Sequence, residues 1–183
     1  MRPRPMFVAA ALVVAALVPA ACGGGGIPAH GCTGIHRDPF DPRSVLHLLP
    51  GAPIPPYVTD PPTSGAHQVG YYPRGVVPAA IADPVQVALL ESGFVVVQYR
   101  PSTGVGGLAA LAGMSPYVTV APNPTLPQPV VATSWLYDMR CGGSGAAAVK
   151  DVRAFVTARV GHGPQPVIPL SETSPGGIRP ARP

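Results

Sequence analysis

The sequence is poor in charged residues, which make up only 11% of its 183 residues. Lys150 is the single lysine, and no cluster of basic residues alternates with aromatic ones. Two of the 12 basic residues, Arg2 and Arg4, lie at the extreme N-terminus, so ten basic residues face eight acidic ones in the remainder. Binding to nucleic acid requires a basic surface, and the sequence therefore excludes this class of function.

The signatures of common catalytic sites are also missing. There is no G-x-S-x-G nucleophile segment, and residues 104–107 (GVGG) lack the lysine of a phosphate-binding loop. No pair of acidic residues suits glycoside hydrolysis. Ser64, His67 and Glu91 could form a triad only if the fold brought them together, which the sequence does not indicate. We therefore expect no enzymatic activity, with a hydrolase as the least favoured alternative.

Proline and glycine are abundant, with 27 and 22 residues. Ten prolines lie in residues 32–80, which predicts a long loop region. The later sequence predicts a helix starting at Asp83-Pro84, a central strand at 94–99, a weak helix at 103–113, strands at 117–121 and 130–135 that pair antiparallel, and a helix at 146–160. The expected fold is α+β: a small single domain, with helices covering a mixed sheet of three or more strands.

The N-terminus has the pattern of an export signal. An uncharged run from Met6 to Val18 is shorter than the roughly 20 residues of a spanning helix, and Ala20 and Ala21 precede Cys22. This segment resembles a bacterial lipobox, with Pro19 where Leu, Val or Ile is usual. The resemblance implies a signal peptide at 1–21 and lipidation of Cys22, which would anchor the protein to the outer face of the cytoplasmic membrane. The alternatives are a secreted protein and an uncleaved helical anchor.

The predicted boundaries follow from this pattern. A Gly-rich tether would span residues 22–31, the folded domain 32–166, and a flexible tail rich in proline and glycine 167–183. If Cys22 is acylated, Cys32 and Cys141 remain, and an even pair outside the cytoplasm predicts a disulfide. The alternative is two separate thiols.

The most distinctive segment is PPTSGAH, residues 61–67. Pro61 and Pro62 favour an extended approach, and Thr63, Ser64 and Gly65 permit a tight turn that would hold His67 in a defined position. Such a loop is typical of a ligand-binding site. The alternative is a structural turn.

The motif order identifies a family. PPTSGAH, LLESGFVVVQY (89–99), APNPTLPQPVVATSW (121–135) and Cys141 resemble the actinobacterial domain of unknown function 3105. That family is marked by PPTSGPH, an HxLEHG segment, an APNP turn and a TAW segment, and the likeness runs from about residue 32 to 166. Its members are typically exported and have no firmly established activity. The resemblance therefore implies a fold and an envelope location.

The sequence departs from the family at two histidines, since the HxLEHG positions hold Ala88 and Ser92. If the family histidines bind a metal, this chain keeps His47, His67 and Glu91, which suit divalent copper or zinc. His30, His36 and His162 are expected in loops, pointing into water.

Trp135, the only tryptophan, ends a predicted strand, and Tyr57, Tyr71, Tyr72 and Phe94 could form an aromatic floor near it. The sequence thus favours a non-enzymatic binding or scaffolding protein of the envelope, with a metal-binding protein as the alternative. No resident cofactor is expected under the first interpretation, and the membrane is the one partner it indicates.

Overall fold

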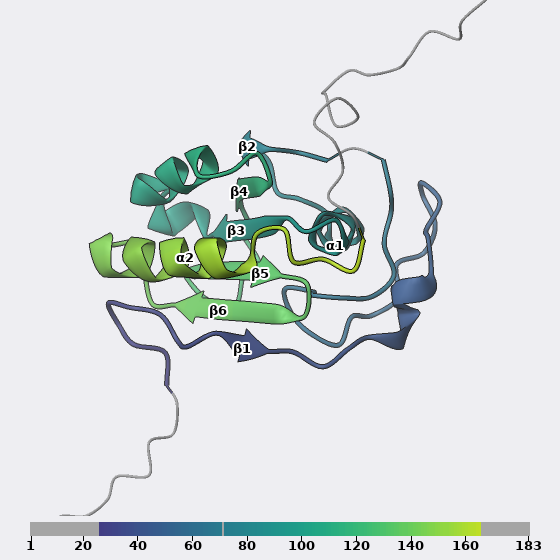
Figure 1. The fold of residues 1–183 in the computed structure, drawn as a ribbon, viewed down its shortest axis with the longest axis horizontal. Coiled ribbons are helices and arrows are strands. Elements are labelled where there is room, and N and C mark those ends of the chain that lie inside the picture. The colour runs from purple at the N-terminus through teal and green to yellow at the C-terminus, as the bar shows by residue number, and fades with distance from the viewer. Residues whose placement is uncertain (1–25, 71, 166–183) are drawn as a thin grey trace, which may run out of the picture.

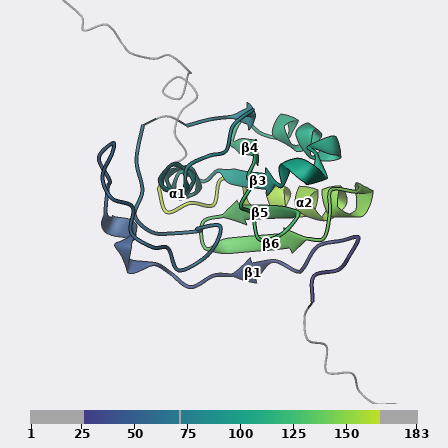
Figure 2. The same ribbon diagram turned by 180° about the vertical axis from the view of Figure 1, so that it is seen from behind.

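The computed structural model describes residues 26–70 and 72–165, which form an α+β domain around one mixed sheet (Figures 1 and 2). Six strands lie in the order β1-β6-β5-β3-β4-β2. The elements along the chain are β1 (His36–Arg37), η1 (Pro42–Val45), β2 (Gly75–Val76), α1 (Asp83–Glu91), β3 (Val95–Tyr99), η2 (Pro101–Thr103), η3 (Gly106–Gly113), β4 (Val118–Pro122), β5 (Val130–Ser134), β6 (Tyr137–Cys141) and α2 (Ala146–Arg159), where η marks a 3-10 helix. The predicted fold class is confirmed.

Strand β3 is central, as predicted, but the predicted pairing of the two later strands is wrong. β4 and β5 do not pair with each other, because β3 lies between them, parallel to β4 and antiparallel to β5. The prolines of residues 122–129 form a connection across the sheet instead of a hairpin turn. β5 forms its hairpin with β6 through Trp135 and Leu136.

Both long helices begin and end near their predicted positions. α1 has Pro84 at its start, where a missing N–H costs no helical hydrogen bond, although Ala82 and not Asp83 is the N-cap. Gly93, with a φ of 80°, follows the end of α1 as the expected stop. The weak helix predicted at 103–113 is instead two 3-10 segments, η2 and η3.

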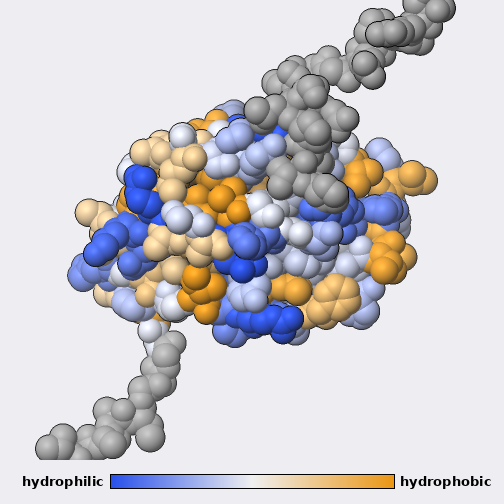
Figure 3. Space-filling view, in the orientation of Figure 1, coloured by the Kyte–Doolittle hydropathy of each residue, from blue (hydrophilic) through white to orange (hydrophobic). Residues whose placement is uncertain are grey.

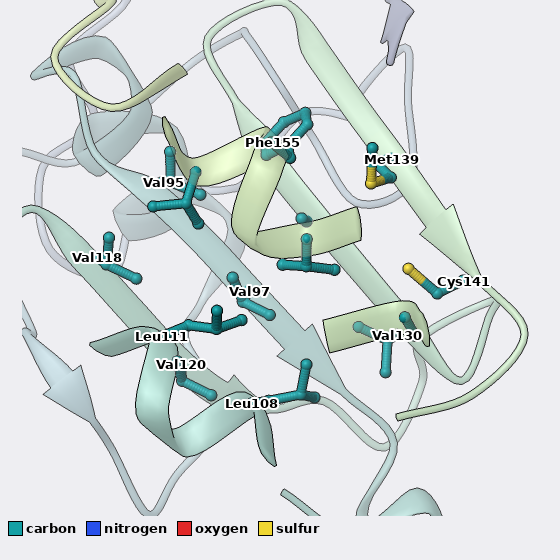
Figure 4. Packing of buried hydrophobic residues seen from close by; sticks show 14 residues of the cluster. Val95, Val97, Leu108, Leu111, Val118, Val120, Val130, Met139, Cys141 and Phe155 are labelled. Carbon is teal, nitrogen blue, oxygen red and sulfur yellow. The ribbon is translucent and has the colours of Figure 1, made fainter. Parts of the chain in front are cut away.

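The side chains on the two faces of β3 belong to two separate hydrophobic clusters. Val95 and Val97 pack with α2 and η3, a cluster that includes Leu108, Leu111 and Phe155 (Figure 4). Val96 faces the other way and packs with α1 and Phe94. Since alternate residues of a strand point to opposite faces, α1 and α2 cover opposite sides of the sheet. Packing against the sheet therefore fixes the position of α1 and of the residues that it carries.

The predicted disulfide is present between Cys32 and Cys141, which are 109 residues apart in sequence. It joins the segment before β1 to the end of β6. The signal at 1–21, Cys22 and residues 23–25 of the tether, and the tail at 167–183 lie outside the described residues. Among the described helices, none is both long enough and apolar enough to cross a membrane.

Large apolar side chains with substantial exposure concentrate in the loop region, residues 35–76. They are Ile35, Phe40, Val45, Leu46, Leu49, Ile54, Val58, Val69 and Val76. Some of this apolar surface is visible at the right-hand edge of Figure 3, where the loop region lies in Figure 1.

Candidate functional site

The PPTSGAH segment is a buried loop, with all of residues 61–67 buried. It contacts several elements at once. Gln86 of α1 donates a hydrogen bond to the carbonyl of Pro62 (2.9 Å), and the carbonyl of Thr63 accepts one from the backbone of Leu136 (3.1 Å). The Tyr57 hydroxyl donates to the carbonyl of Ala66 (2.7 Å), and burial raises the pKa of Tyr57. The loop therefore has a fixed conformation, as its sequence predicts.

A polar network joins this loop to η1. Asp41 N donates to Ser64 Oγ, and Gly65 N donates to Ser44 Oγ, each at 2.9 Å. The fully buried Asp41 carboxylate accepts two hydrogen bonds from the Arg43 guanidinium, at 2.8 and 2.7 Å. These bonds from Arg43 lower the pKa of Asp41, because they stabilise its charged form. The sequence motif gave no sign of Asp41 or Ser44, since both lie about twenty residues upstream.

Gly65 is required by both space and backbone geometry. Its φ is +131°, a value that residues with side chains rarely adopt. A Cβ at this position would lie 2.8 Å from the Tyr57 ring and 2.9 Å from Asp41 Oδ2. The glycine thus lets the loop pass tightly beneath the ring before it reaches His67.

His67 is completely buried, and its two ring nitrogens have different surroundings. Nδ1 lies 3.2 Å from the carbonyl oxygen of Gly65, which can only accept a hydrogen bond. Nδ1 must therefore carry a proton. Nε2 lies 2.8 Å from Glu91 Oε2. This contact is short enough for an ion pair, yet within the described part of the chain Nε2 has no hydrogen-bond partner.

A backbone bridge places His47 beside His67. Residues 47 and 67 form an isolated parallel bridge, with Leu48 N donating to His67 O (2.7 Å) and His67 N donating to Leu46 O (3.0 Å). The two imidazole rings meet edge to face with their centroids 4.6 Å apart. His47 is exposed, so it lies on the solvent side of the group.

Glu91 completes the cluster from the last turn of α1. One ligand atom from each of His47, His67 and Glu91 lies within 4.8 Å of the others. The three predicted ligands, from three separate segments, therefore do converge. Tyr72 lies close by: burial raises its pKa and the Glu91 charge raises it further, while the Ser92 hydroxyl acts in the opposite direction.

Ala88 and Ser92, the two positions where the sequence resemblance leads us to expect histidines, are next to this cluster. They are four residues apart and buried: Ala88 lies in α1 three residues before Glu91, and Ser92 is the C-cap of the helix. Residues at these spacings share one face of a helix. The helix face that carries Glu91 is therefore the face on which those histidines would lie.

The other candidates have different surroundings. His30 and His162 are exposed, as expected. His36 does not simply point into water, because it lies in β1 with Nδ1 3.2 Å from Asp38 Oδ1. Trp135 is half-buried against the α1-side cluster together with Tyr72 and Phe94. Tyr57 packs on the loop instead, and Tyr71 lies outside the described residues.

A serine–histidine pair is not assembled. Ser64 Oγ accepts from Asp41 N, while the His67 nitrogens face Gly65 O and Glu91. The arrangement instead offers two imidazoles and a carboxylate to a common point.

Comparison with known proteins gave one finding. The family model described as "Protein of unknown function (DUF3105)" matches residues 53–172. Neither the curated proteins nor the solved structures gave a match. The match includes His67 and Glu91, whereas His47 precedes it.

Proposed function

The chain belongs to the family of proteins of unknown function DUF3105, and we propose that it is a metal-binding protein of the cell envelope. In this proposal one zinc or copper ion is held by His47, His67 and Glu91. The protein binds the ion and catalyses no reaction.

The observation that carries the proposal is the state of His67 Nε2. With the proton on Nδ1, a neutral ring has a lone pair on Nε2. That lone pair lies buried, 2.8 Å from a carboxylate oxygen, and no described residue forms a hydrogen bond with it. Two electron-rich atoms this close repel each other unless a positive charge lies between them or beside them. A metal ion bound by both atoms would supply this charge, and His47 lies within reach as a third ligand.

The surroundings of the three ligands support the same conclusion. A metal-binding histidine commonly donates its other ring N–H to a carbonyl, which fixes its orientation, and Gly65 O is placed for this role. Two imidazoles and one carboxylate form a donor set common for zinc and also suited to copper. Because His47 is exposed, a fourth position would open to solvent, where the ion could be exchanged.

Placement at the envelope is supported by the N-terminal sequence and the disulfide. Cys22 follows an uncharged run, and the Cys32–Cys141 bond suits an oxidising compartment. We propose that Cys22 is lipidated and holds the domain on the outer face of the cytoplasmic membrane. Cys22→Ala should then release the protein from membranes, and unchanged membrane partition would contradict the lipid anchor.

Calorimetric titration of metal-free protein with Zn²⁺ and Cu²⁺ tests the metal site. We expect one ion to bind at this site, and His47→Ala to weaken its binding by at least about tenfold, on the order of the losses seen when metal sites are altered. Glu91→Gln, which keeps the side-chain size, should also weaken it. His162→Ala is the matched control, because His162 is exposed and outside the cluster. Unchanged affinity in both site variants would refute the proposal.

A scaffolding role without metal is the second candidate. Val45, Leu46 and Leu49 are exposed beside His47, and such apolar side chains are typical of a protein contact. The calorimetric titration distinguishes metal binding from scaffolding, because scaffolding requires no bound ion.

A further inference from the structure

We propose that the protein has a second divalent-cation site, formed by His36, Asp38 and Asp138 at the β1–β6 edge of the sheet. It shares no ligand with the site described above and does not depend on it. Two of its three residues, His36 and Asp38, precede the segment matched by the family model.

The strand register brings the three side chains together. His36 in β1 is directly opposite Asp138 in β6. Residues opposite each other in an antiparallel pair place their side chains on the same face of the sheet. Asp38 is two residues after His36, so it also lies on this face. His36 Nδ1 is 3.2 Å from Asp38 Oδ1 and 3.5 Å from Asp138 Oδ1.

Each carboxylate is oriented by a hydrogen bond to Oδ2, the oxygen that does not face His36. Asp38 Oδ2 accepts a hydrogen bond from Thr63 Oγ1 at 2.9 Å. Asp138 Oδ2 accepts one from Arg140 Nε at 2.5 Å. In both cases Oδ1 is left facing His36. Ligating carboxylates in metal sites are commonly held in this way by a second hydrogen bond.

The balance of charge also favours a cation. The Asp38 and Asp138 side chains are only 4% and 3% exposed. Burying two neighbouring carboxylates is costly unless positive charge compensates them. Arg140 supplies one positive charge, and it contacts only Asp138 of the two. A cation between the two Oδ1 atoms would compensate the negative charge that remains.

The site is open to solvent on one side. The three residues line a surface pocket of about 530 Å³ together with Thr33, Gly34, Ile35 and Arg140. His36, with 67% of its side chain exposed, lies where an ion would enter. One nitrogen and two carboxylate oxygens form a harder donor set than that of the first site. Such a set suits Mn²⁺ better than copper.

The test is a titration with Mn²⁺ followed by electron paramagnetic resonance, in which free Mn²⁺ gives a signal that is lost on binding. The protein carries His47→Ala, which removes an exposed ligand of the first site. We expect one Mn²⁺ to bind per chain of this variant. Adding His36→Ala should weaken binding at least about tenfold. Adding His30→Ala instead should change nothing, because His30 is also exposed but lies outside the cluster.

His36 is the residue to change because its exposure makes misfolding improbable, whereas Asp38 and Asp138 are buried. The proposal is overturned if the His47→Ala protein binds no Mn²⁺, or if the His36→Ala double variant binds it with unchanged affinity. Neither result would bear on zinc or copper at the first site, which is measured separately in protein with His47 present.

Discussion

At the scale of single residues, the candidate metal site depends on a glycine that donates no ligand. The carbonyl of Gly65 fixes the orientation of the His67 ring through Nδ1. The same residue has a positive φ and no room for a Cβ. A change at Gly65 should therefore affect both stability and metal affinity.

We predict that Gly65→Ala lowers the free energy of unfolding by about 2–4 kcal/mol, through backbone strain and contact with the Tyr57 ring. Chemical denaturation measures this loss. Gly70→Ala is the matched control, because its φ is +144° but, among the described residues apart from its chain neighbours, no atom lies within 4 Å of the added Cβ. The control should lose only about 1 kcal/mol, from strain alone. Equal losses in the two variants would show that the packing around Gly65 does not matter.

The residues of the first site could be predicted from sequence, but their geometry could not. His47, His67 and Glu91 are selected by their chemistry and by the family motif. Their convergence depends on a backbone bridge between residues 47 and 67, for which no sequence pattern exists. The contacts of His36 were missed because strand β1 has only two residues, too few to show alternation.

At the scale of elements, the position of the PPTSGAH loop depends on η1. Asp41 and Ser44 hold Ser64 and Gly65, and Arg43 neutralises the buried Asp41 carboxylate. The loop and η1 should therefore lose stability together when the charge on Asp41 is disturbed.

We predict that Arg43→Ala lowers the free energy of unfolding at pH 7, since the buried Asp41 carboxylate loses both hydrogen bonds from the guanidinium. The pKa of Asp41 is depressed in the folded state. Its stabilising effect is therefore present above the unfolded pKa of about 3.9 and is lost as the pH falls below it. The difference between variant and wild type should shrink at about pH 3.

Urea unfolding at the two pH values gives this comparison. Arg37→Ala is the control, because Arg37 is an exposed arginine of β1. A deficit in Arg43→Ala that stays constant between the two pH values would contradict the role given to the Asp41 charge.

The strands were predicted where a run of β-branched residues is buried, as in β3, β4 and β5. β6 was missed because YDMRC contains two charged residues, and their partners, Thr33, Asp60 and His36, lie far away in sequence. The wrong pairing of β4 with β5 has the same origin. Without β6, proximity in sequence favours β4 as the partner of β5, whereas in the sheet β5 lies between β3 and β6.

At the scale of the whole molecule, the Cys32–Cys141 bond joins the segment before β1 to the last strand of the sheet. We predict that reduction lowers the free energy of unfolding by up to about 4–5 kcal/mol, the value that the chain-entropy model gives for a loop of this size. Guanidinium unfolding of oxidised and reduced wild-type protein measures the effect without changing a side chain. Cys32→Ser is the control, and it should unfold like the reduced protein. An unchanged midpoint after reduction would show that the bond does not stabilise the fold.

The central claim is that His67 Nε2 and Glu91 Oε2 bind a common metal ion. It is tested most directly by anomalous diffraction at the zinc edge, from crystals of the protein grown with one equivalent of Zn²⁺. We predict an anomalous peak about 2.0–2.2 Å from both atoms, with their separation widened from 2.8 Å to about 3.4 Å. A His67–Glu91 pair that keeps its present separation, with the zinc peak elsewhere or absent, would contradict the claim.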